Sequence, residues 1–478
     1  MFLSPGEPDI EIAGLTSDSR AVKPGFLFAA LPGANTDGAR FIANAARRGA
    51  CAVLAPPSAA ALAHDAHLPL IADENPRRRY ALMAANFHGD QPKTIVAVTG
   101  TNGKSSVVSF TRQVWQRLGR RAASMGTLGV SAPGFEAGPS LTTPDAGDLH
   151  KMLAALAKDG IDHLAFEASS HGLDQYRSDG VRLAAAAFTN LTRDHLDYHG
   201  TEATYFRAKA RLFEELLPAG GAAVLNANSA QFEALSEISR RRGHRILSYG
   251  IGGCDVRLVS HEPQANGQRL EIKVGGETHH VETGLVGDFQ AENLLCALAL
   301  AIACDEDAAT AVQALGGVAG VPGRLEEIAR RDDGATVYVD YAHTPDALVA
   351  ALRAMRSHTN GRLHLVFGCG GDRDPGKRPQ MGAIAAELAD RVIVTDDNPR
   401  DEDPATIRAE ILAACPDATE VSDRAEAINE AVRGLGPGDV LLIAGKGHEA
   451  YQIVGAETIP FDDAEFVRKA FTAPGGGA

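Results

Sequence analysis

Short apolar runs recur along the chain from Thr94 onward, and nearly every run ends in a cluster of polar residues or glycines. Residues 94–98 lead into Thr99, residues 162–166 lead into Glu167, and the weaker run 184–188 leads into Thr189. Segments with helical periodicity lie between these runs, such as residues 105–118 and 204–217. Strand and helix patterns that alternate in this way predict a parallel sheet covered by helices on both faces.

The pattern predicts a further unit on each side of this region. Residues 1–90 contain a polar turn at 16–20, an apolar stretch at 26–31, an alanine-rich helix from about Phe41, and a strand at 51–54. A third unit begins near Arg324 and repeats the strand pattern at residues 336–339, 363–367, 391–395 and 439–443. The domains are therefore predicted as residues 1–90, 91–322 and 323–478, in line with about three domains for a chain of this length. Residues 269–274 alternate differently and predict an antiparallel hairpin insertion.

Composition and charge exclude some classes of function. The net charge of −15 argues against general binding to nucleic acids or membrane surfaces. The six cysteines show neither a CxxC pair nor metal-ligand spacing, which indicates free thiols in a reducing cytoplasm. The longest apolar run, residues 294–304, is too short to span a bilayer and predicts a core helix. Residues 1–5 do not resemble a signal peptide. We therefore expect a cytoplasmic protein that binds small molecules. We also expect it to be a monomer.

The polar clusters have a common position at the ends of strands. Ligands of open parallel sheets bind beyond the carboxyl ends of the strands. Two such sheets, one in the central unit and one in the C-terminal unit, would form a cleft between the domains. Closure of the third domain onto the second is a hypothesis that follows from this division of the motifs.

The clearest motif is the loop of residues 100–105, called the phosphate loop below, which lies between a predicted strand and a predicted helix. Its glycines allow backbone N–H groups to approach phosphate oxygens, and the helix N-terminus adds a positive dipole. Lys104 could reach the outer phosphates, and the hydroxyl of Ser105 could hold Mg²⁺. The spacing is GxxGKS, since Val98 stands where the longer GxxxxGKS motif has its first glycine. The alternative is a glycine-rich turn without function.

Other polar residues are weaker signals by themselves. Glu167 ends an apolar run, which favours a role with a metal or a phosphate. His195 lies in the polar segment 190–200, but a lone histidine is more often a hydrogen-bonded structural group than a ligand. Lys209 lies on an amphipathic helix, where a lysine is ordinarily solvated.

Together and in this order, the motifs resemble those of the Mur ligases, the enzymes of bacterial peptidoglycan synthesis, over nearly the whole chain. The matching segments are residues 18–20 (DSR), 100–105 (GTNGKS), 167–172 (EASSHG), 190–200 (NLTRDHLDYHG), 340–345 (DYAHTP), 371–373 (GDR), 397–400 (DNPR) and 445–449 (GKGHE). The resemblance implies an α/β fold of three domains: a small N-terminal α/β domain that binds a UDP-linked substrate, a central ATP-binding domain with a parallel sheet of the P-loop type, and a Rossmann-like C-terminal domain that binds an amino acid.

The resemblance also implies the chemistry. ATP would phosphorylate a carboxylate of the UDP-linked substrate, and an amine would attack the acyl phosphate to form an amide. Mg²⁺ would be required at the transferring phosphoryl group. By resemblance, Ser105, Glu167 and His195 serve the metals, and Lys209 matches a lysine that the family carbamylates to hold a second Mg²⁺. The expected catalytic residues are Lys104, Glu167, His195 and Lys209. The expected ATP-binding residues are Gly100, Thr101, Asn102, Gly103, Lys104, Ser105, Ser106, Asn293, Arg324 and Asp340, the last as a ribose contact.

The UDP-linked substrate, UDP-N-acetylmuramoyl-L-alanyl-D-glutamate, is expected to contact the first domain and the facing side of the second. By resemblance, Ser17 and Ser19 lie near its diphosphate. For Ser17 in particular, the alternative is an ordinary turn or cap. The remaining expected contacts are Ala34, Asn35 and Thr36 near the uracil and Thr142, Thr143, Ser169, Gln175 and Arg177 near the muramoyl dipeptide.

The incoming amino acid is predicted from the C-terminal motifs. Meso-diaminopimelate carries a zwitterion at its far end, so its site needs a guanidinium for the carboxylate and an anion for the ammonium. Arg400 and Arg373 supply guanidinium groups, and Glu449 supplies an acid. This pattern resembles the diaminopimelate-adding branch, because lysine-adding relatives lack the arginine of DNPR. The expected set is Arg373, Asp397, Asn398, Pro399, Arg400, Gly445 and Glu449.

Some positions depart from the family pattern, and other functions remain open. Leu141 replaces an expected Asn, Phe289 and Gln290 replace an aromatic residue or His followed by Asn, and Ser105 replaces the commoner Thr. Within the same class, the alternatives are a lysine-adding ligase, a D-alanyl-D-alanine-adding ligase and a folylpolyglutamate synthase. From other classes, the alternatives are a non-catalytic nucleotide-binding sensor and a phosphoryl-transfer kinase. The retention of Lys104, Glu167, His195 and Lys209 together argues against a sensor.

Overall fold

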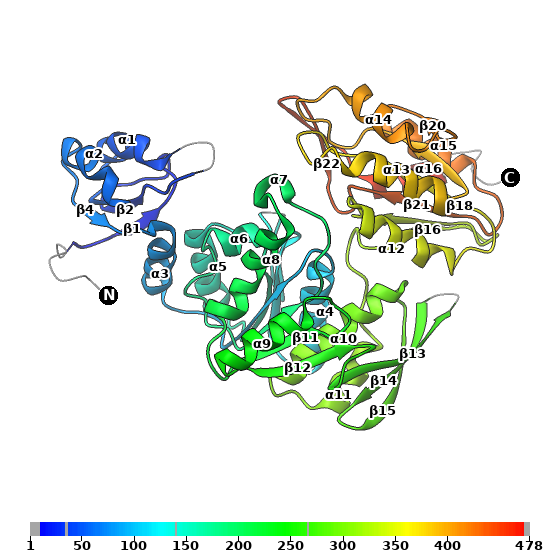
Figure 1. Ribbon diagram of the computed structural model, residues 1–478, viewed down its shortest axis with the longest axis horizontal. Helices are drawn as coiled ribbons and strands as arrows, with labels where there is room; N and C mark the ends of the chain where they lie inside the picture. The colour runs from blue at the N-terminus through cyan, green and yellow to red at the C-terminus, as the bar shows by residue number, and fades with distance from the viewer. Residues whose placement is uncertain (1–9, 34–36, 139–140, 265–266, 473–478) are drawn as a thin grey trace.

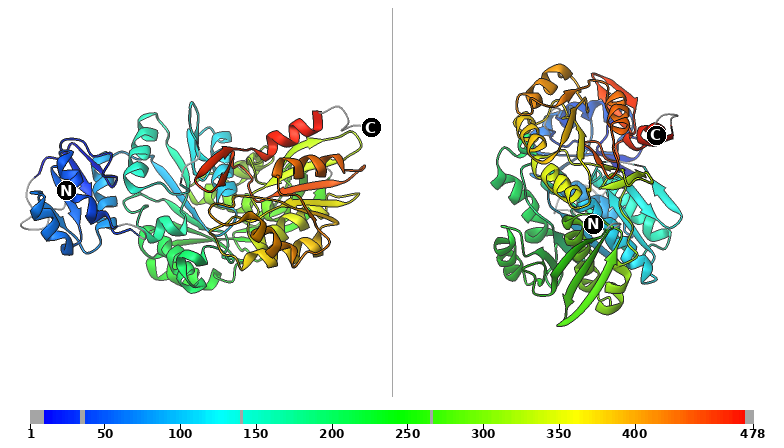
Figure 2. Two further views of the ribbon diagram at one scale, coloured as in Figure 1. Left: turned by 90° about the horizontal axis from the view of Figure 1, so that it is seen from above. Right: turned by 90° about the vertical axis from the view of Figure 1, so that its right-hand side faces the viewer.

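The structure is a computed structural model that describes residues 10–33, 37–138, 141–264 and 267–472. These residues fold into three units, with the N-terminal and C-terminal units at opposite ends of the central one (Figures 1 and 2). Each unit is built on its own sheet. The α/β class and the arrangement into three units were both predicted, and the structure confirms them. The predicted domain limits remain predictions.

The N-terminal unit is a parallel sheet of strand order β1-β2-β3-β4. Its strands are β1 (Gly14–Thr16), β2 (Phe26–Ala29), β3 (Ala52–Ala55) and β4 (Leu70–Ala72). Its helices are η1 (Gly38–Phe41), α1 (Ile42–Arg47), η2 (Pro57–Ala59), α2 (Ala60–Asp65) and α3 (Pro76–His88). Helix α3 starts sharply because Asn75 caps it and Pro76 occupies its first turn. Tyr80 of α3 shares an apolar cluster with Leu27 and with Ala146 of the central unit, so α3 connects the two units.

The central unit contains the sheet predicted from the apolar runs, in the order β15-β14-β13-β12-β11-β10-β5-β9-β6-β7-β8. Strands β12 to β6 in this order pair in parallel, whereas β13 to β15 and β6 to β8 pair antiparallel. The hairpin predicted at residues 269–274 is confirmed as part of β14. The strands are β5 (Thr94–Thr99), β6 (Ala122–Gly126), β7 (Gly129–Ala132), β8 (Phe135–Ala137), β9 (His163–Glu167), β10 (Ala185–Phe188), β11 (Ala222–Asn226), β12 (Arg245–Gly250), β13 (Val256–Gln264), β14 (Gly267–Val274) and β15 (Glu277–Thr283).

Helices cover both faces of this central sheet. Along β5, Val96 and Val98 pack with α4, α10 and α11, while Ile95 and Ala97 pack with α5 and α9, as the alternation of side chains in a strand requires. The helices are α4 (Lys104–Arg117), α5 (Ala146–Lys158), α6 (Ser170–Asp174), α7 (Leu196–His199), α8 (Glu202–Arg211), the π-helical turn η3 (Leu212–Leu216), α9 (Phe232–Arg242), α10 (Asp288–Ala303) and α11 (Ala308–Leu315). The predicted core helix at 294–304 is confirmed within α10.

The C-terminal unit has a sheet of order β16-β17-β21-β18-β19-β20, in which β16 alone among the described strands pairs antiparallel. Its strands are β16 (Glu326–Arg330), β17 (Thr336–Asp340), β18 (Leu363–Phe367), β19 (Arg391–Val394), β20 (Thr419–Glu420) and β21 (Val440–Ala444), followed by the hairpin β22 (Tyr451–Val454) and β23 (Glu457–Pro460). Its helices are α12 (Pro345–Arg356), α13 (Lys377–Leu388), α14 (Pro404–Leu412), α15 (Arg424–Arg433) and α16 (Asp463–Thr472). Apolar clusters on the two faces of the sheet form its core.

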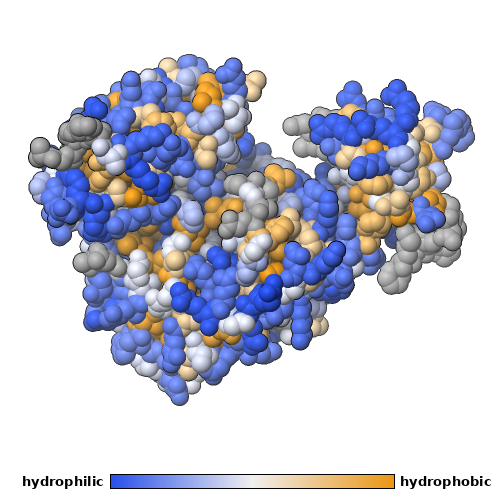
Figure 3. Space-filling model, turned by 180° about the vertical axis from the view of Figure 1, so that it is seen from behind, coloured by the Kyte–Doolittle hydropathy of each residue, from blue (hydrophilic) through white to orange (hydrophobic). Residues whose placement is uncertain are grey.

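Parallel pairing brings the polar strand ends together at one edge of each sheet. In the central sheet, Val98 is paired with Glu167, and Thr99 with Phe188. In the C-terminal sheet, Asp340 is paired with Ala444. The face seen in Figure 3 is mostly hydrophilic, with small separate apolar areas. Within the residues that the structure describes, no helix combines the length and apolar character needed to cross a membrane.

Candidate nucleotide and amino-acid site

The phosphate loop connects β5 to α4, and two of its glycines have conformations that side chains rarely adopt. Gly100 has φ +152° and Gly103 has φ +86°. A Cβ at Gly100 would lie 1.8 Å from Thr189 Oγ1, and a Cβ at Gly103 would lie 2.4 Å from Asn293 Oδ1. Helix α4 begins at Lys104 without a side-chain cap, so its first N–H groups are available to an anion. The loop therefore suits a phosphate, as predicted from its sequence.

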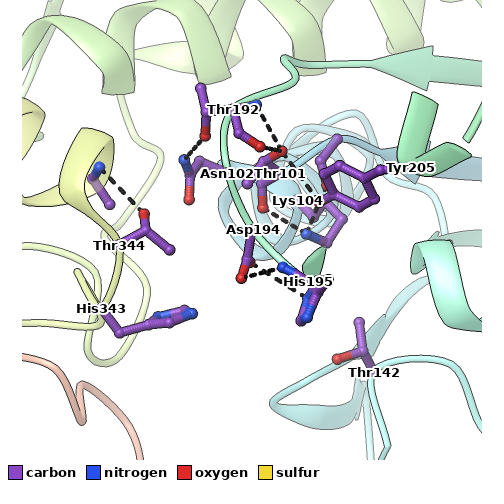
Figure 4. Close-up of polar contacts among 12 residues, drawn as sticks. Thr101, Asn102, Lys104, Thr142, Thr192, Asp194, His195, Tyr205, His343 and Thr344 are labelled. Atoms are coloured by element: carbon purple, nitrogen blue, oxygen red, sulfur yellow. Dashed lines mark hydrogen bonds and ion pairs between the residues drawn. The ribbon is translucent and has the colours of Figure 1, made fainter. Parts of the chain in front are cut away.

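Segment 189–192, which follows β10, holds the phosphate loop in place. Thr189 Oγ1 donates to the carbonyl of Asn102 at 2.6 Å, and Asn190 Oδ1 accepts from the N–H of Asn102 at 2.9 Å. The N–H of Thr192 donates to Thr101 Oγ1 at 3.0 Å (Figure 4). The polar density of this segment, noticed in the sequence, thus supports the loop from the neighbouring strand.

Lys104 bends back onto the loop. Its Nζ donates to the carbonyls of Gly100 at 2.9 Å and Thr101 at 2.8 Å. Burial lowers its pKa, although Glu167 and Asp194 act in the opposite direction. Two backbone carbonyls are weaker partners for an ammonium group than a phosphate would be. A bound anion would therefore draw Lys104 away from the loop.

A cavity of about 370 Å³ opens in front of the phosphate loop, between the central and C-terminal units. The central unit supplies one wall and residues 340–350 of the C-terminal unit supply the other. Figure 4 shows His343 projecting from the C-terminal side toward Asp194 and His195. The predicted site residues that line the cavity are Thr101, Asn102, Gly103, Lys104, Ser105, Ser106, Thr142, Glu167, Ser169, His195, Lys209, Asn293, Arg324 and Asp340.

Glu167 and Ser105 are two of the oxygen donors predicted to serve the metals. Glu167 is 1% exposed, and its carboxylate accepts from the N–H of Thr127 at 2.9 Å and from Thr127 Oγ1 at 3.2 Å. Ser105 Oγ accepts from Arg324 at 3.2 Å. Arg324 also lies over the ring of Tyr341, 4.3 Å from its centroid, and its buried Nε has no hydrogen-bond partner. An unpaired buried N–H of a cation beside this loop is available to an anionic ligand.

The donor set fits Mg²⁺ only if the substrate supplies part of the coordination. Among the described residues, no group of three or more His, Cys, Asp or Glu side chains is arranged to hold a metal. Mg²⁺ usually keeps several waters and binds one or two protein oxygens together with substrate phosphates. Ser105 and Glu167 beside the phosphate loop match that arrangement. The predicted metal roles of His195 and Lys209 remain predictions.

His195 precedes α7 in a left-handed conformation, with φ +53°. Its N–H donates to Asp194 Oδ1 at 2.8 Å, and its ring Nε2 lies 3.4 Å from Asp194 Oδ2. The His195 side chain is 44% exposed, but its surroundings lower its pKa to about 4. Burial is the main cause, Asp194 opposes it, and the nearby Lys104 and Lys209 reinforce it. The imidazole is therefore neutral at physiological pH, which is the form that can bind a metal.

Lys209 is far from the solvated lysine that its helix pattern suggests. It is 1% exposed, its Nζ donates to the carbonyl of Gly100 at 2.8 Å, and it lies 4.4 Å from the ring centroid of Tyr205. Burial, together with Lys104, lowers its pKa well below the usual value. Burial therefore favours the uncharged, nucleophilic form of this amine, which lines the cavity.

Asp340 ends β17 and turns toward its own backbone. Its carboxylate accepts from the N–H groups of Leu325 at 2.7 Å and Ala342 at 2.8 Å. Burial raises its pKa to about 6, and Arg324 acts in the opposite direction. Asp340 lines the cavity, as its predicted ribose contact requires, but it also holds the backbone of Leu325 and Ala342.

The residues predicted to contact the muramoyl dipeptide form a hydrogen-bonded network at the end of β9. Thr143 Oγ1 donates to the carbonyl of Glu167 at 2.9 Å and lies 3.0 Å from Ser169 Oγ. Arg177 donates to the carbonyl of Thr143 at 2.8 Å and to Gln175 Oε1 at 2.7 Å. These groups have structural roles in addition to any substrate contact.

The first unit contributes fewer described residues to the predicted substrate contacts. Ser17 Oγ donates to Asp145 Oδ2 at 3.2 Å, which joins the N-terminal unit to the cap of α5. Ser19 lies in the same turn and is partly buried. Ala34, Asn35 and Thr36 lie outside the described residues. Leu141, one of the departures from the family pattern, is 61% exposed.

A second polar group lies at the strand ends of the C-terminal sheet. We call Asp397, Asn398, Arg400, Lys446 and Glu449 the amino-acid cluster. Asn398 Nδ2 donates to Glu449 Oε2 at 2.8 Å, and the fully buried Lys446 donates to Asn398 Oδ1 at 3.2 Å. Burial and the nearby Asp397 raise the pKa of Glu449. The structure thus brings most of the predicted amino-acid residues together.

Arg400 extends the amino-acid cluster toward Gly371, and the other predicted residues are Gly445, Pro399 and Arg373. Arg400 donates to the carbonyl of Gly371 at 2.7 Å. Gly445 has φ +112°, and a Cβ there would lie 2.5 Å from Asp397 Oδ2. Pro399 is buried, whereas Arg373 is exposed and donates to the carbonyl of Asp372 at 3.1 Å. Arg373 thus contacts its own loop, and its predicted contact with the amino acid remains a prediction.

Sequence reasoning missed several residues of the site. Lys446 lies within a motif that was recognised, but its burial against Asn398 and Glu449 was not predicted. Asp194, which orients His195, was also part of a recognised motif. Arg193 and Asp374 form an ion pair of 2.9 Å between the central and C-terminal units, and no local pattern indicated it.

Comparisons with known proteins support one family. The family model described as "Mur ligase, glutamate ligase domain" matches residues 323–447, and "Mur ligase middle domain" matches residues 98–301. "Mur ligase family, catalytic domain" matches residues 11–88. A relative from Caulobacter vibrioides, named UDP-N-acetylmuramoyl-L-alanyl-D-glutamate--2,6-diaminopimelate ligase, is 53% identical over 469 residues, covering 97% of this chain and 96% of the relative.

Solved structures agree with this result. A structure of a UDP-N-acetylmuramoyl-L-alanyl-D-glutamate--2,6-diaminopimelate ligase matches with a TM-score of 0.69 and 34% identity, covering 96% of this chain and 94% of the other. A folylpolyglutamate synthase from Mycobacterium tuberculosis, complexed with ADP and AMPPCP, matches with a TM-score of 0.65 but only 18% identity, over 84% of this chain and 95% of the other, which shows a shared fold alone. The chain belongs to the Mur ligase family.

Proposed function

We propose that this chain is an ATP-dependent ligase that joins meso-2,6-diaminopimelate to UDP-N-acetylmuramoyl-L-alanyl-D-glutamate in peptidoglycan synthesis. One observation carries the proposal: a phosphate loop and an amino-acid cluster lie at the strand ends of two neighbouring sheets in a chain 53% identical to a relative of that name. One chain supplies both walls of the cavity, so we propose that it acts as a monomer. Because ATP is an intracellular substrate, the proposal includes a cytoplasmic location.

In the proposed reaction, a carboxylate oxygen of the D-glutamate residue attacks the γ-phosphorus of ATP, and ADP leaves. The amine of diaminopimelate then attacks the acyl carbon, and phosphate leaves as the amide forms and the nitrogen loses a proton. The N–H groups of the phosphate loop, Lys104 and Arg324 would bind the phosphates and stabilise the charge that develops on the transferring group. Ser105 and Glu167 would hold Mg²⁺, which neutralises phosphate charge when bound.

The buried amine of Lys209 supports the proposal that this residue is carbamylated. An uncharged amine adds to CO₂ and releases one proton, giving a carbamate anion. Lys104 lies close enough to lower the pKa of Lys209, and it would stabilise the anion by the same electrostatic interaction. The neutral imidazole of His195, on the same side of the cavity, would act with it as a metal ligand.

The acceptor follows from the charges of the amino-acid cluster. The carboxylate at the far end of diaminopimelate would pair with Arg400, and its ammonium with Asp397 and Glu449. Lysine lacks that carboxylate and would leave the Arg400 guanidinium without an anionic partner. The cluster therefore favours a diaminopimelate-adding enzyme over a lysine-adding one.

The direct test is to incubate the enzyme with ATP, Mg²⁺, the UDP-linked dipeptide and meso-diaminopimelate, and to identify the amide product by mass spectrometry. Arg400→Lys should raise the KM for diaminopimelate about 30-fold, since lysine keeps the charge but loses the bidentate hydrogen bonds to the carboxylate, a loss of about 2 kcal/mol. Arg391→Lys, an exposed position in the same domain, is the matched control and should leave it unchanged. No amide product, or an unchanged KM in Arg400→Lys, would contradict the proposal.

A further inference from the structure

A buried ion pair lies next to the amino-acid cluster. Arg424, the first residue of α15, and Asp463, the first residue of α16, are both inaccessible to solvent. Arg424 Nε and one terminal nitrogen donate to the two carboxylate oxygens of Asp463 at 2.7 Å each. The two helices pack against each other beside β21 (Figure 1).

The remaining donors of Arg424 reach the two strand ends that carry the amino-acid cluster. The terminal nitrogen that pairs with Asp463 also donates to the carbonyl of Ala444 at 3.0 Å, immediately before Gly445. The other donates to the carbonyl of Asp396 at 3.5 Å, immediately before Asp397. The guanidinium plane therefore spans the starts of both segments that form the cluster.

Asp463 connects the pair to a third part of the cluster. It follows the hairpin β22–β23, and that hairpin contacts the cluster directly. The N–H of Ile453 donates to Asn398 Oδ1 at 3.0 Å, and the carbonyl of Ile453 accepts from the N–H of Arg400 at 3.1 Å. Through Asp463, Arg424 thus links the end of the hairpin to the two strand ends.

Stability alone is a weak explanation for such a pair. Removing two charges from water is costly, and buried ion pairs can often be replaced by apolar residues without loss of stability. What apolar residues cannot replace is a set of donors in a fixed plane, since a guanidinium holds several acceptors in one geometry. The position of the acceptors points to a role in geometry.

We propose that Arg424, held by Asp463, is a positioning residue for the amino-acid substrate, which fixes the relative placement of segments 397–400 and 445–449. This inference rests on the proposed function and extends it to a residue that touches no substrate. Burial lowers the pKa of Arg424, but Asp463, and after it Asp397 and Glu449, raise it above the usual value. Arg424 thus also lies within the electrostatic field of the cluster's two acids.

The test compares three variants in steady-state phosphate release, with each of the three substrates varied in turn. Arg424→Lys keeps the charge but loses the fork. Arg424→Met/Asp463→Leu removes both charges. Asp439→Asn is the matched control, because Asp439 pairs with His364 at 3.0 Å, buried at the opposite edge of the same sheet. Unfolding temperatures are measured in parallel, and the kinetics are run below all of them.

We expect both Arg424 variants to raise the KM for the amino acid about tenfold, the effect of one or two weakened hydrogen bonds, and to leave the KM values for ATP and the UDP-linked dipeptide unchanged. Asp439→Asn should lower the unfolding temperature without changing any KM. The inference is overturned if the amino-acid KM is unchanged, if all three KM values rise together, or if the control raises the amino-acid KM equally. If only the double variant folds, its KM for the amino acid decides the test. If neither Arg424 variant folds, the ion pair serves the fold and the inference fails.

The same experiment separates this inference from the proposed function. Turnover of the parent enzyme with diaminopimelate tests the proposed acceptor. The ratio of variant KM to parent KM, for whichever amino acid the parent uses, tests the role of Arg424. If the parent enzyme used lysine, the proposed acceptor would be wrong. The role of Arg424 would then be judged from the KM for lysine.

Discussion

Replacing Gly103 with alanine should weaken ATP binding as well as the fold. Gly103 has φ +86°, where a side chain costs about 1 kcal/mol. The new Cβ would also lie 2.4 Å from Asn293 Oδ1 and force that amide to move. Asn293 would then lose its 3.0 Å hydrogen bond to Gln290, a further loss of about 1 kcal/mol. Because Asn293 lines the cavity, the displacement changes the proposed nucleotide site.

The control lies at the other end of the same helix. Gly119 follows α4, has φ +80°, and a Cβ there meets nothing within 4 Å. Gly119→Ala therefore carries the same backbone strain without the collision. In thermal unfolding, both variants should lose stability, with Gly103→Ala losing about 1 kcal/mol more.

Phosphate release measured against ATP concentration separates the two variants. Gly103→Ala should raise the KM for ATP about tenfold, the equivalent of about 1.4 kcal/mol, and Gly119→Ala should not change it. If Gly103→Ala bound ATP as well as the parent, or if Gly119→Ala were equally impaired, the assignment of the phosphate loop and of Asn293 to the nucleotide would be wrong.

Three further predictions address other parts of the site. Lys209→Met should abolish phosphate release without lowering the unfolding temperature. The unfolding temperature is kept because the one hydrogen bond that is lost is offset by the desolvation cost of the buried amine, which disappears. A variant that remained active would exclude a carbamate. Since the pKa of Asp340 is raised from 3.8 to about 6, its stability contribution is complete below pH 3.8 and is lost as the pH rises through about 6. As the pH rises through this range, the free energy of unfolding of the parent should fall by about 3 kcal/mol relative to that of Asp340→Asn. If the two free energies changed with pH in the same way, the raised pKa of Asp340 would be contradicted. Asp374→Asn breaks the partly exposed pair with Arg193 and should lower the free energy of unfolding by less than about 1 kcal/mol. It should also reduce the compaction that an ATP analogue and the UDP-linked dipeptide cause, as measured by small-angle scattering. If the parent showed no compaction, domain closure would be excluded.

The sequence predicted local structure well where the pattern was strong. Strand β5 and the start of α4 could be placed because an apolar run, two glycines and a helical period follow one another. The expected helix at 204–217 was correct in position, but it ends as α8 at Arg211 and continues as a π-helical turn. That change depends on packing around residues 212–216, which periodicity does not record. The strand order β10-β5-β9 likewise depends on pairings between distant segments.

The site could be predicted only as far as its motifs were local. The phosphate loop is contiguous, so its residues could be named from the sequence. The burial of Lys209 depends on a carbonyl 109 residues away, and its helix pattern suggested a solvated side chain. The pairs Arg424–Asp463 and Arg193–Asp374 join segments that lie far apart in the chain. The exposure of Arg373 and its contact with Asp372 likewise depend on the conformation of its loop, which its motif does not indicate.

The central claim is that this site activates a carboxylate for attack by an amino acid with a zwitterion at its far end. Phosphate release from ATP tests it most directly, with UDP-N-acetylmuramoyl-L-alanyl-D-glutamate present and either meso-diaminopimelate or L-lysine as the acceptor. We predict rapid release with diaminopimelate and little with lysine, since lysine has no carboxylate for Arg400. Turnover with lysine and not with diaminopimelate, or release that needs no acceptor, would contradict the account.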